Sequence, residues 1–289
     1  MWERVLMYLF ILFIVLFIAM LWLMLYDTTR FTVQKLTLRD SRIRKPCRAV
    51  VLSDLHNKQY GKNNELLLAK IRECEPDFIL IAGDMITAKP GKSFEKTLEF
   101  LKKLSEICPI CYGNGNHEQR LKLYPGTYGD MAEKLAKAFE EIGIAPLVNE
   151  STLLEEYGIR VTGLEMDKRF YVRFRIPVME DSYLRDTLGE CKKEFYSVLL
   201  AHNPDYFPNY AAWGADLVLS GHVHGGIVRV PFWGKGVLSP NVRLFPRYDG
   251  GIFHKGESTM LVDRGLGEHT IPFRLFNPAE LWVLCFEPL

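Results

Sequence analysis

The sequence predicts an α/β domain of two packed β-sheets flanked by helices, behind one N-terminal transmembrane helix. Three observations support this prediction. An uncharged apolar segment covers residues 5–26. After it, short apolar runs that end in turn-type residues alternate with stretches of helical periodicity. Apolar residues make up 48% of the chain and charged residues 25%, a balance that favours a globular domain over a disordered chain.

The apolar segment contains no charge and no proline, so it can form one helix roughly 30 Å long, the thickness of a bilayer core. Aromatic side chains, which favour the headgroup region, lie near both of its ends: Trp2, Trp22 and Tyr26. A cleaved signal peptide and a buried core helix are the alternatives. The run is long for a signal peptide, however, and no small-residue cleavage pattern follows it. We therefore expect a membrane anchor at residues 1–30 and one domain at 31–289.

The two flanks of the segment differ in charge. Arg4 is the only basic side chain before it, whereas six basic residues follow within a short distance: Arg30, Lys35, Arg39, Arg42, Arg44 and Lys45. The positive-inside rule keeps such a flank in the cytoplasm. The sequence thus predicts a single-pass protein of the cell membrane and favours a cytoplasmic position for the domain.

The elements of the domain follow in order. Residues 31–38 read as a first strand and 39–45 as a basic connector. Five apolar runs predict strands that end in turn-type residues: 49–54, 78–84, 110–116, 197–202 and 217–222. Amphipathic periodicity predicts helices at 64–75, 93–107 and 130–142. Residues 147–165 favour short strands around a Tyr157-Gly158 turn, and the tail from Val228 favours further strands.

Charge and cysteine content exclude some classes of function. The net charge is +1 and the basic residues are spread along the chain, so we expect no nucleic-acid partner. Six cysteines are too few for a disulfide framework in a chain of this length. In a strand, Cys108 and Cys111 would point to opposite faces, which disfavours a thiol oxidoreductase or a CxxC metal site.

The candidate site consists of side chains at the ends of the predicted strands. Of seven histidines, five lie there: His56, His117, His202, His222 and His224. His254 and His269 lie outside the motifs, and we expect them at the surface or behind the site. Ligands of α/β proteins bind at the carboxyl ends of strands, so the sequence should bring the five together.

Local spacing indicates a site for two metal ions. Asp54 and His56, like His222 and His224, stand two residues apart on one face of an extended segment. Their separation suits two metals about 3.5–4 Å apart that share a ligand. Asp84 has two carboxylate oxygens and can bridge both metals, while Asn116 offers a neutral oxygen. Glycine precedes Asp84, Asn116 and His222, which permits tight turns beside the metals.

Five sequence blocks, in this order, resemble the calcineurin-like metallophosphoesterase superfamily: Asp54-x-His56, Gly83-Asp84, Gly115-Asn116-His117-Glu118, His202 and Gly221-His222-x-His224. The tail resembles the bacterial membrane-associated phosphodiesterase branch through His224-Gly225-Gly226, Arg229-Val230-Pro231, Gly265-Leu266-Gly267 and Pro278-Ala279-Glu280. The resemblance covers nearly all of residues 31–289 and implies the sandwich fold predicted above.

The resemblance also implies a role for each site residue. One metal would be bound by Asp54, His56, Asp84 and His224, and a second by Asp84, Asn116, His202 and His222. His117 would remain off the metals, near the leaving group. Two positions depart from the commoner pattern: Thr87 stands where an acidic residue is frequent, and Ile227 where a polar one is usual. Neither belongs to the ligand set, so both bear on the substrate rather than on metal binding.

The chemistry expected is hydrolysis of a phosphate ester, most simply a phosphodiester, by a hydroxide that bridges two divalent ions, with His117 as general acid. Mixed carboxylate, amide and imidazole ligands suit Mn²⁺, Fe²⁺ or Zn²⁺. The membrane anchor points to a lipid-linked substrate. Alternatives are a lipid-linked diphosphate hydrolase and a membrane-anchored scaffold that binds metal without catalysis. Arg120 is a candidate contact for substrate phosphate or, equally, a solvated charge.

Overall fold

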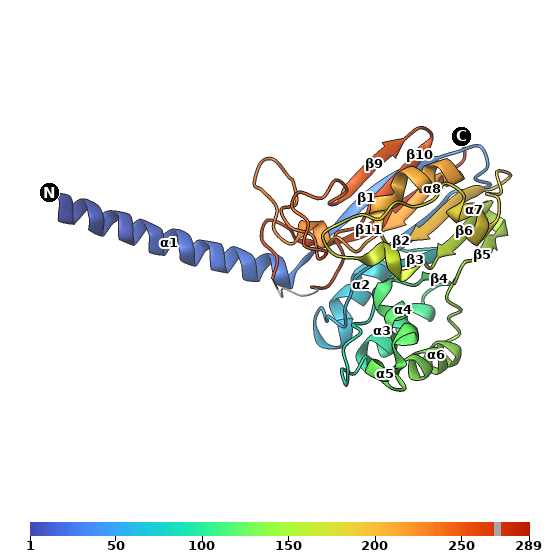
Figure 1. Cartoon of the computed structure of the whole chain (residues 1–289), viewed down its shortest axis with the longest axis horizontal. Coiled ribbons are helices and arrows are strands. Elements are labelled where there is room, and N and C mark those ends of the chain that lie inside the picture. Colours follow the sequence, from blue (N-terminus) through green and yellow to red (C-terminus); the bar gives the residue numbers. More distant parts are fainter. Residues whose placement is uncertain (269–272) are drawn as a thin grey trace.

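A computed structural model describes residues 1–268 and 273–289. It contains one long N-terminal helix, α1 (Trp2–Thr29), that projects from a domain of two β-sheets and flanking helices (Figure 1). His269 lies outside the described residues.

The first sheet has the order β1-β11-β2-β3-β4 in the described part of the chain. Its strands are β1 (Phe31–Arg39), β2 (Cys47–Leu52), β3 (Phe78–Ala82), β4 (Ile110–Gly113) and β11 (Ala279–Glu287). β2, β3 and β4 run parallel to one another, β11 runs antiparallel to β2, and β1 runs parallel to β11. The strands at the two ends of the domain, β1 and β11, are therefore neighbours in this sheet.

The second sheet has the order β5-β6-β7-β8-β10-β9. Its strands are β5 (Glu150–Leu154), β6 (Ile159–Leu164), β7 (Tyr196–Ala201), β8 (Leu217–Ser220), β9 (Gly251–Lys255) and β10 (Ser258–Val262). β6, β7, β8 and β10 are parallel, and the edge strands β5 and β9 are antiparallel to their neighbours. The strands predicted before residue 165 are confirmed, including the turn at Gly158, whose φ is +68°.

Three apolar clusters hold the layers together. One lies between the sheets and contains Val51, Leu80 and Leu200. A second covers the outer face of the first sheet, where Leu101 of α3 (Glu95–Ser105) contributes. A third covers the outer face of the second sheet, where Tyr210 of α8 (Phe207–Trp213) contributes. The predicted fold class, two packed sheets flanked by helices, is confirmed. Burial of so many aliphatic side chains supplies most of the driving force for folding.

The helices cover the two outer faces. Beside the first sheet lie α2 (Glu65–Glu73), α3 (Glu95–Ser105), α4 (Asn116–Leu123), α5 (Pro125–Tyr128) and α6 (Met131–Ile142); α7 (Tyr183–Leu188) and α8 (Phe207–Trp213) lie beside the second. Single turns of 3₁₀ helix occur at Lys62–Asn64, Glu155–Tyr157, Lys168–Tyr171, Pro204–Tyr206 and His224–Gly226. The three helices predicted from periodicity are confirmed.

The further strands predicted in the tail from Val228 are present as β9, β10 and β11. Residues 228–250, however, form a long loop with only isolated bridges, such as Arg229 to Gly236. Three prolines interrupt this segment, at 231, 240 and 246, and each removes a backbone donor that a sheet would need. Strands resume only at β9, where β10 becomes available as a hydrogen-bonding partner.

The helix α1 is separate from the core. None of its most apolar 18-residue window is buried, and its mean hydropathy is 2.9. The helix is long and apolar enough to cross a membrane, and its exposure rules out the buried core helix considered above. Its last turn does contact the domain, because Asp27 is buried.

The two close cysteines lie on opposite faces of the first sheet, as predicted. Cys111 packs in the cluster between the sheets, whereas Cys108 packs against the cluster under the helices. Both thiols are free. Burial raises the pKa of Cys108 to about 11 and the pKa of Cys111 to about 12.

Candidate metal centre

The predicted site residues lie at one edge of the two sheets. β2, β3 and β4 end just before Asp54, Asp84 and Asn116, and β7 and β8 end just before His202 and His222. Because parallel strands end at the same edge of a sheet, the fold gathers these side chains from segments far apart in the sequence. The structure brings all seven predicted ligands and His117 to this edge, where all eight are buried.

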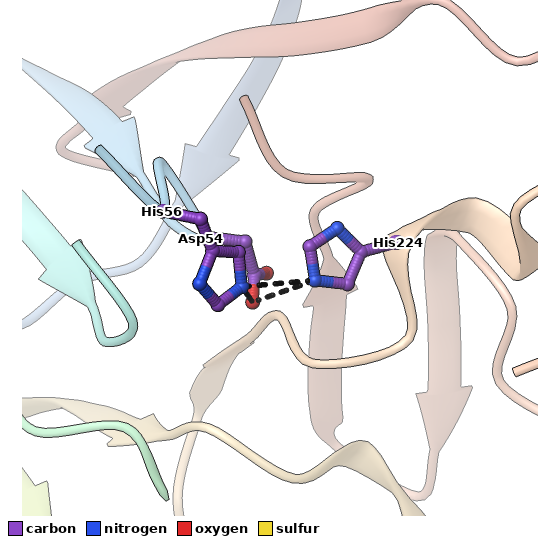
Figure 2. A group of neighbouring side chains, drawn as sticks. All are labelled: Asp54, His56 and His224. Carbon is purple, nitrogen blue, oxygen red and sulfur yellow. Dashed lines mark hydrogen bonds and ion pairs between the residues drawn. The ribbon is translucent and has the colours of Figure 1, made fainter. Parts of the chain in front are cut away.

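The first group of possible ligands is Asp54, His56 and His224, shown in Figure 2. Asp54 Oδ1 lies 3.4 Å from His224 Nε2 and 3.7 Å from His56 Nε2. The two imidazole nitrogens are 3.2 Å apart. The ligand atoms of all three residues therefore face one point.

The second group is Asp84, His202 and His222. His202 Nε2 lies 3.0 Å from Asp84 Oδ2 and 3.7 Å from Asp54 Oδ1, so it connects the two groups. Asp84 also forms a third group with His56 and His117, whose Nε2 atoms lie 3.9 Å and 4.0 Å from Asp84 Oδ2. Asp84 thus occupies the centre of the site, as a bridging ligand must.

Each central carboxylate uses one oxygen to hold the backbone and directs the other toward the histidines. Asp54 Oδ2 accepts a hydrogen bond from His222 N at 2.9 Å, and Asp84 Oδ1 accepts one from His117 N at 2.7 Å. Asp54 Oδ1 and Asp84 Oδ2 remain directed toward the imidazoles.

The backbone at the site is strained. Asp54, His56, Asp84, His222 and His224 all have positive φ values, between +49° and +70°. This left-handed conformation is uncommon for residues other than glycine and persists only where the surrounding structure enforces it. Its concentration at the predicted ligands marks the edge as a functional site.

Two glycines permit the close approach of the β3 and β4 ends at the site. Gly83 has a φ of +92°, and a Cβ on it would lie 2.6 Å from the Cα of Gly115. A Cβ on Gly115 would in turn lie 2.6 Å from the backbone nitrogen of Asp84. Side chains at these positions would push Asp84 and Asn116 apart, which confirms the expected role of both glycines.

Electrostatics keep the two carboxylates ionised. Burial alone would raise the pKa of Asp54, but the nearby His224 and His202 lower it below its usual range. The same balance, with His202 and His117 as the opposing charges, holds the pKa of Asp84 well below its usual range. Burial alone would lower the pKa of His202, but Asp84 and Asp54 raise that pKa to about 10.

The donor atoms fit a pair of metal ions. Asp54 Oδ1 and Asn116 Oδ1 are buried and have no hydrogen-bond partner among the described residues. A buried polar atom without a partner costs about 1–3 kcal/mol, and coordination of a cation would remove that cost. Carboxylate, amide and imidazole together form the mixed donor set of transition-metal sites.

Contacts behind the ligands fix the orientation of the imidazole rings. His202 Nδ1 lies 2.6 Å from the carbonyl of Ala82, and His224 Nδ1 lies 3.2 Å from the carbonyl of Gly267. A carbonyl at Nδ1 places the proton there and leaves Nε2 as the ligand atom. His222 instead has the side-chain nitrogen of Asn241 at 2.8 Å from its Nε2. Asn241 was not anticipated from the sequence.

His117 has a different partner. The backbone N–H of Ala88 donates to His117 Nδ1 at 2.8 Å, so the neutral ring carries its proton on Nε2. Nε2 faces the site, 4.0 Å from Asp84 Oδ2. Thr87, where an acidic residue is frequent, donates its hydroxyl to the carbonyl of His56 at 3.0 Å.

Glu118 organises the site without facing it, a role that the sequence did not reveal. Its carboxylate accepts hydrogen bonds from the backbone nitrogens of Asp84, Met85 and Gly115, each at 2.9 Å. The hydroxyl of Tyr112 also donates to it at 3.0 Å. Burial, and secondarily the charge of Asp84, raise the pKa of Glu118 to about 7. Its position three residues after Gly115 is the one usable signal, because a glutamate there can cap a helix N-terminus.

A pocket of about 400 Å³ opens beside Asn116. Arg120, Lys168 and Arg169 contribute positive charge to its lining, and Tyr171 contributes an aromatic wall. The Tyr171 ring lies 5.3 Å from the ring of His222, so the pocket is continuous with the site. His254, by contrast, lies on the edge strand β9, away from the ligands.

The chain is similar to known proteins in sequence. The family model described as calcineurin-like phosphoesterase matches residues 47–226. The uncharacterized metallophosphoesterase YkuE of Bacillus subtilis is 25% identical over 243 residues, which are 82% of this chain and 78% of that protein. The phosphodiesterase YaeI of Escherichia coli is 26% identical over 230 residues, 77% of this chain and 76% of that protein. Among solved structures, TT1561 of Thermus thermophilus aligns with a TM-score of 0.47 and 14% identity, over 76% of this chain and 90% of that one.

Proposed function

The chain belongs to the calcineurin-like phosphoesterase family, and from this we propose that it is a phosphodiesterase dependent on two metal ions. Its class, a metal-dependent phosphoester hydrolase, follows from the family and from the ligand groups at the strand ends. The observation that carries the finer proposal is the position of Asp84 Oδ2 between two groups of histidines.

We assign the ligands as the motifs predict. Asp54, His56, Asp84 and His224 would hold one metal, and Asp84, Asn116, His202 and His222 the other. Asp54 Oδ1 and Asn116 Oδ1 are buried and accept no hydrogen bond among the described residues, which supports this assignment. Bound there, two cations would neutralise the substrate phosphate and lower the pKa of a water molecule. Mn²⁺, Fe²⁺ and Zn²⁺ all suit the donor set.

His117 acts on the leaving group in this proposal. Its Nε2–H faces the site because Nδ1 accepts the Ala88 amide. The ring can therefore stabilise the leaving oxygen by a hydrogen bond from Nε2–H as negative charge develops there. A neutral histidine in such a position is an effective electrophile.

The substrate is a phosphate diester with a lipid or other bulky group. The name of the similar protein YaeI, a phosphodiesterase, supports the diester. The pocket beside Asn116 has room for one ester substituent, and Arg120 and Lys168 favour a substituent with negative charge. The positive charge of the pocket also favours the second candidate, a lipid-linked diphosphate hydrolase, because a diphosphate would place its additional phosphate in this pocket.

α1 serves as a retained membrane anchor at residues 1–30, and residues 31–289 form the catalytic domain. Asp27 accepts a hydrogen bond from Asn277 N, and Thr28 Oγ1 accepts one from Arg274 N. Removal of the apolar segment as a signal peptide would break both contacts, which supports retention. The basic flank after α1 favours the cytoplasmic side for the domain.

An activity panel tests the proposal. The full chain in detergent is loaded with Mn²⁺, Zn²⁺, Co²⁺ or Fe²⁺ and assayed with bis(p-nitrophenyl) phosphate and with p-nitrophenyl phosphate. We expect turnover with at least one metal and a preference for the diester. Metal binding without turnover of either ester would favour the non-catalytic scaffold and overturn the proposal.

A further inference from the structure

The metal centre lies at the edge of the sheets where α1 enters the domain. β1 begins at Phe31, paired with Ala279, the first residue of the parallel strand β11. β2 runs antiparallel to β11, so β2 ends, and Asp54 follows, near the point where β11 begins. Only Arg30 separates α1 from β1. The site is therefore close to the domain end of the apolar helix.

Hydrogen bonds fix α1 to this edge, so the helix is not a loose tether. Buried Asp27 accepts from Asn277 N at 3.2 Å, and Thr28 Oγ1 accepts from Arg274 N at 3.0 Å. Lys58 donates to the carbonyl of Thr28. Asn277 in turn donates its side-chain amide to the carbonyl of the ligand His224 at 2.7 Å. One residue thus links the end of α1 to the metal centre.

Two loops next to the site expose a group of apolar side chains that we call the apolar rim. It consists of Phe174, Ile176, Val178, Phe232, Trp233, Val242, Leu244 and Phe245. Phe232 is fully exposed and Trp233 is 64% exposed. The loop between β8 and β9, which carries five of the eight, extends from the sheets on the side from which α1 leaves (Figure 1). Exposed apolar groups of this size mark an interaction surface.

The rim is attached both to the metal centre and to the α1 junction. Asn241 contacts His222 through its side chain and accepts the N–H of Phe174 at 3.0 Å through its carbonyl, which joins the two loops. At the base of the longer loop, Arg229 N donates to Leu275 O at 3.1 Å, next to the residues that hold α1. The buried Arg229 guanidinium also donates to Gly225 O at 3.0 Å. These contacts fix the base of the two loops beside the metal centre and the α1 junction.

The charge of the rim is one-sided. Residues 172–178 and 227–248 contain no acidic side chain and six basic ones. Arg229 and Arg243 pair with Asp249 and Asp205, while three arginines at positions 173, 175 and 247 are exposed. Exposed aromatics beside exposed arginines are typical of surfaces that enter the headgroup region of anionic membranes.

We propose that the apolar rim docks on the anionic surface of the bilayer that α1 spans, so that the metal centre opens toward the membrane. The site would then act on phosphate esters whose lipid portion remains in the bilayer. This inference rests on the proposed function for α1 as an anchor, and it deepens the proposed substrate class. The occupant of the rim is the lipid surface, because the fixed end of α1 holds the rim against it.

Tryptophan quenching tests the docking. The full chain carries Trp2→Phe and Trp22→Phe, which remove the tryptophans of α1, and is reconstituted in phosphatidylcholine–phosphatidylglycerol vesicles with brominated acyl chains. We expect the brominated chains to quench the fluorescence of Trp233. That signal is identified as the part of the emission that a further Trp233→Phe change removes. The matched control carries Trp233→Phe together with Leu289→Trp, which places an exposed tryptophan after β11 at the opposite edge, and it should not be quenched. Equal quenching at both positions, or none at Trp233, would overturn the docking.

A second assay tests the substrate class. Hexadecyl p-nitrophenyl phosphate in the same vesicles releases p-nitrophenol when water cleaves its aryl ester, and hexadecyl phosphate remains. Phe232→Ser with Trp233→Ser should slow this reaction several-fold and leave turnover of soluble bis(p-nitrophenyl) phosphate unchanged. Equal rates on the vesicle substrate would refute the lipid-side orientation. If the unmodified chain does not hydrolyse soluble bis(p-nitrophenyl) phosphate, the hydrolase proposal is contradicted instead. The quenching result would still decide whether the rim docks on the membrane.

Discussion

Glu118 Oε2 accepts a hydrogen bond from the backbone nitrogen of Asp84 at 2.9 Å, so a residue of α4 holds the loop that carries the central ligand. The same helix begins with Asn116, a proposed ligand of the second metal. The distance between Asp84 and Asn116 is therefore set by Glu118, which contacts neither metal in our assignment.

Glu118→Gln tests this positioning role. The amide nitrogen would face backbone N–H groups that now donate to a carboxylate, so we expect a loss of about 1–3 kcal/mol in the free energy of unfolding. Metal affinity should fall as well, because Asp84 and Asn116 would separate. Thermal unfolding and metal titration measure the two effects. Glu141→Gln, at an exposed position on α6, is the control, and equal behaviour of the two variants would contradict the role.

Asp84→Asn tests the bridging position. The change keeps the shape of the side chain and removes the negative charge that Asp84 Oδ2 directs toward three histidines. We expect at most one tightly bound metal per chain and loss of turnover, because the two cations would repel each other without the shared carboxylate. Asp130→Asn, an exposed change before α6, should keep both metals. Full metal content in the Asp84 variant would show that the bridge lies elsewhere.

His117→Ala should keep both metals and lower kcat by about 10²–10⁴-fold for esters with poor leaving groups, on which more negative charge develops. Esters with good leaving groups should lose less. His117→Gln should recover part of the rate, because its amide N–H can replace the Nε2–H donor. Loss of metal in the alanine variant would instead show that His117 is a ligand. The 4.0 Å between His117 Nε2 and Asp84 Oδ2 is short enough for both to bind one metal.

The cysteine pair should have no part in catalysis. The pKa values of about 11 and 12 mean that Cys108 and Cys111 remain protonated thiols at neutral pH, since a raised pKa favours the neutral form below it. Alanine at both positions should leave turnover unchanged. In the unmodified folded chain, labelling of these thiols by a maleimide should be slow at pH 7 and rise only in strong alkali. Loss of turnover in a folded double variant would revive a thiol mechanism.

Arg120→Ala tests the charged pocket beside Asn116. If an additional phosphate of the substrate binds there, the variant should raise KM for a diphosphate ester about tenfold, the effect of one charge-assisted hydrogen bond. KM for bis(p-nitrophenyl) phosphate should change little. Arg72→Ala on the exposed face of α2 is the control. An equal change for both esters would show that Arg120 contacts the reacting phosphate instead.

Much of this site could be predicted from the sequence, for a physical reason. Ligands at the ends of parallel strands reach one edge whatever the loop lengths, so the positions of Asp54, Asp84 and His202 follow from the pattern of apolar runs. Asn241 could not be found this way, because its contact with His222 depends on the path of an irregular loop. The same holds for Ala88, whose backbone amide donates to His117 Nδ1.

The fold likewise has parts that the sequence predicts and parts that it does not. Strands and helices with a regular period were predicted within a few residues. The tail contains the further strands predicted, but only from β9 onward, because the apolar residues before β9 belong to an exposed loop rather than to a sheet. The sequence alone does not distinguish an apolar side chain at the surface from one in the core. Only the folded structure shows that Phe232 and Trp233 are exposed.

The most direct test of the central claim is a titration of the metal-free full chain with Mn²⁺, followed at once by metal content and by hydrolysis of bis(p-nitrophenyl) phosphate. We predict that activity rises until two ions are bound per chain and then stays constant, and that His202→Ala lowers both the metal content and the activity. Full activity with one bound ion, or two bound ions without hydrolysis, would contradict the two-metal mechanism.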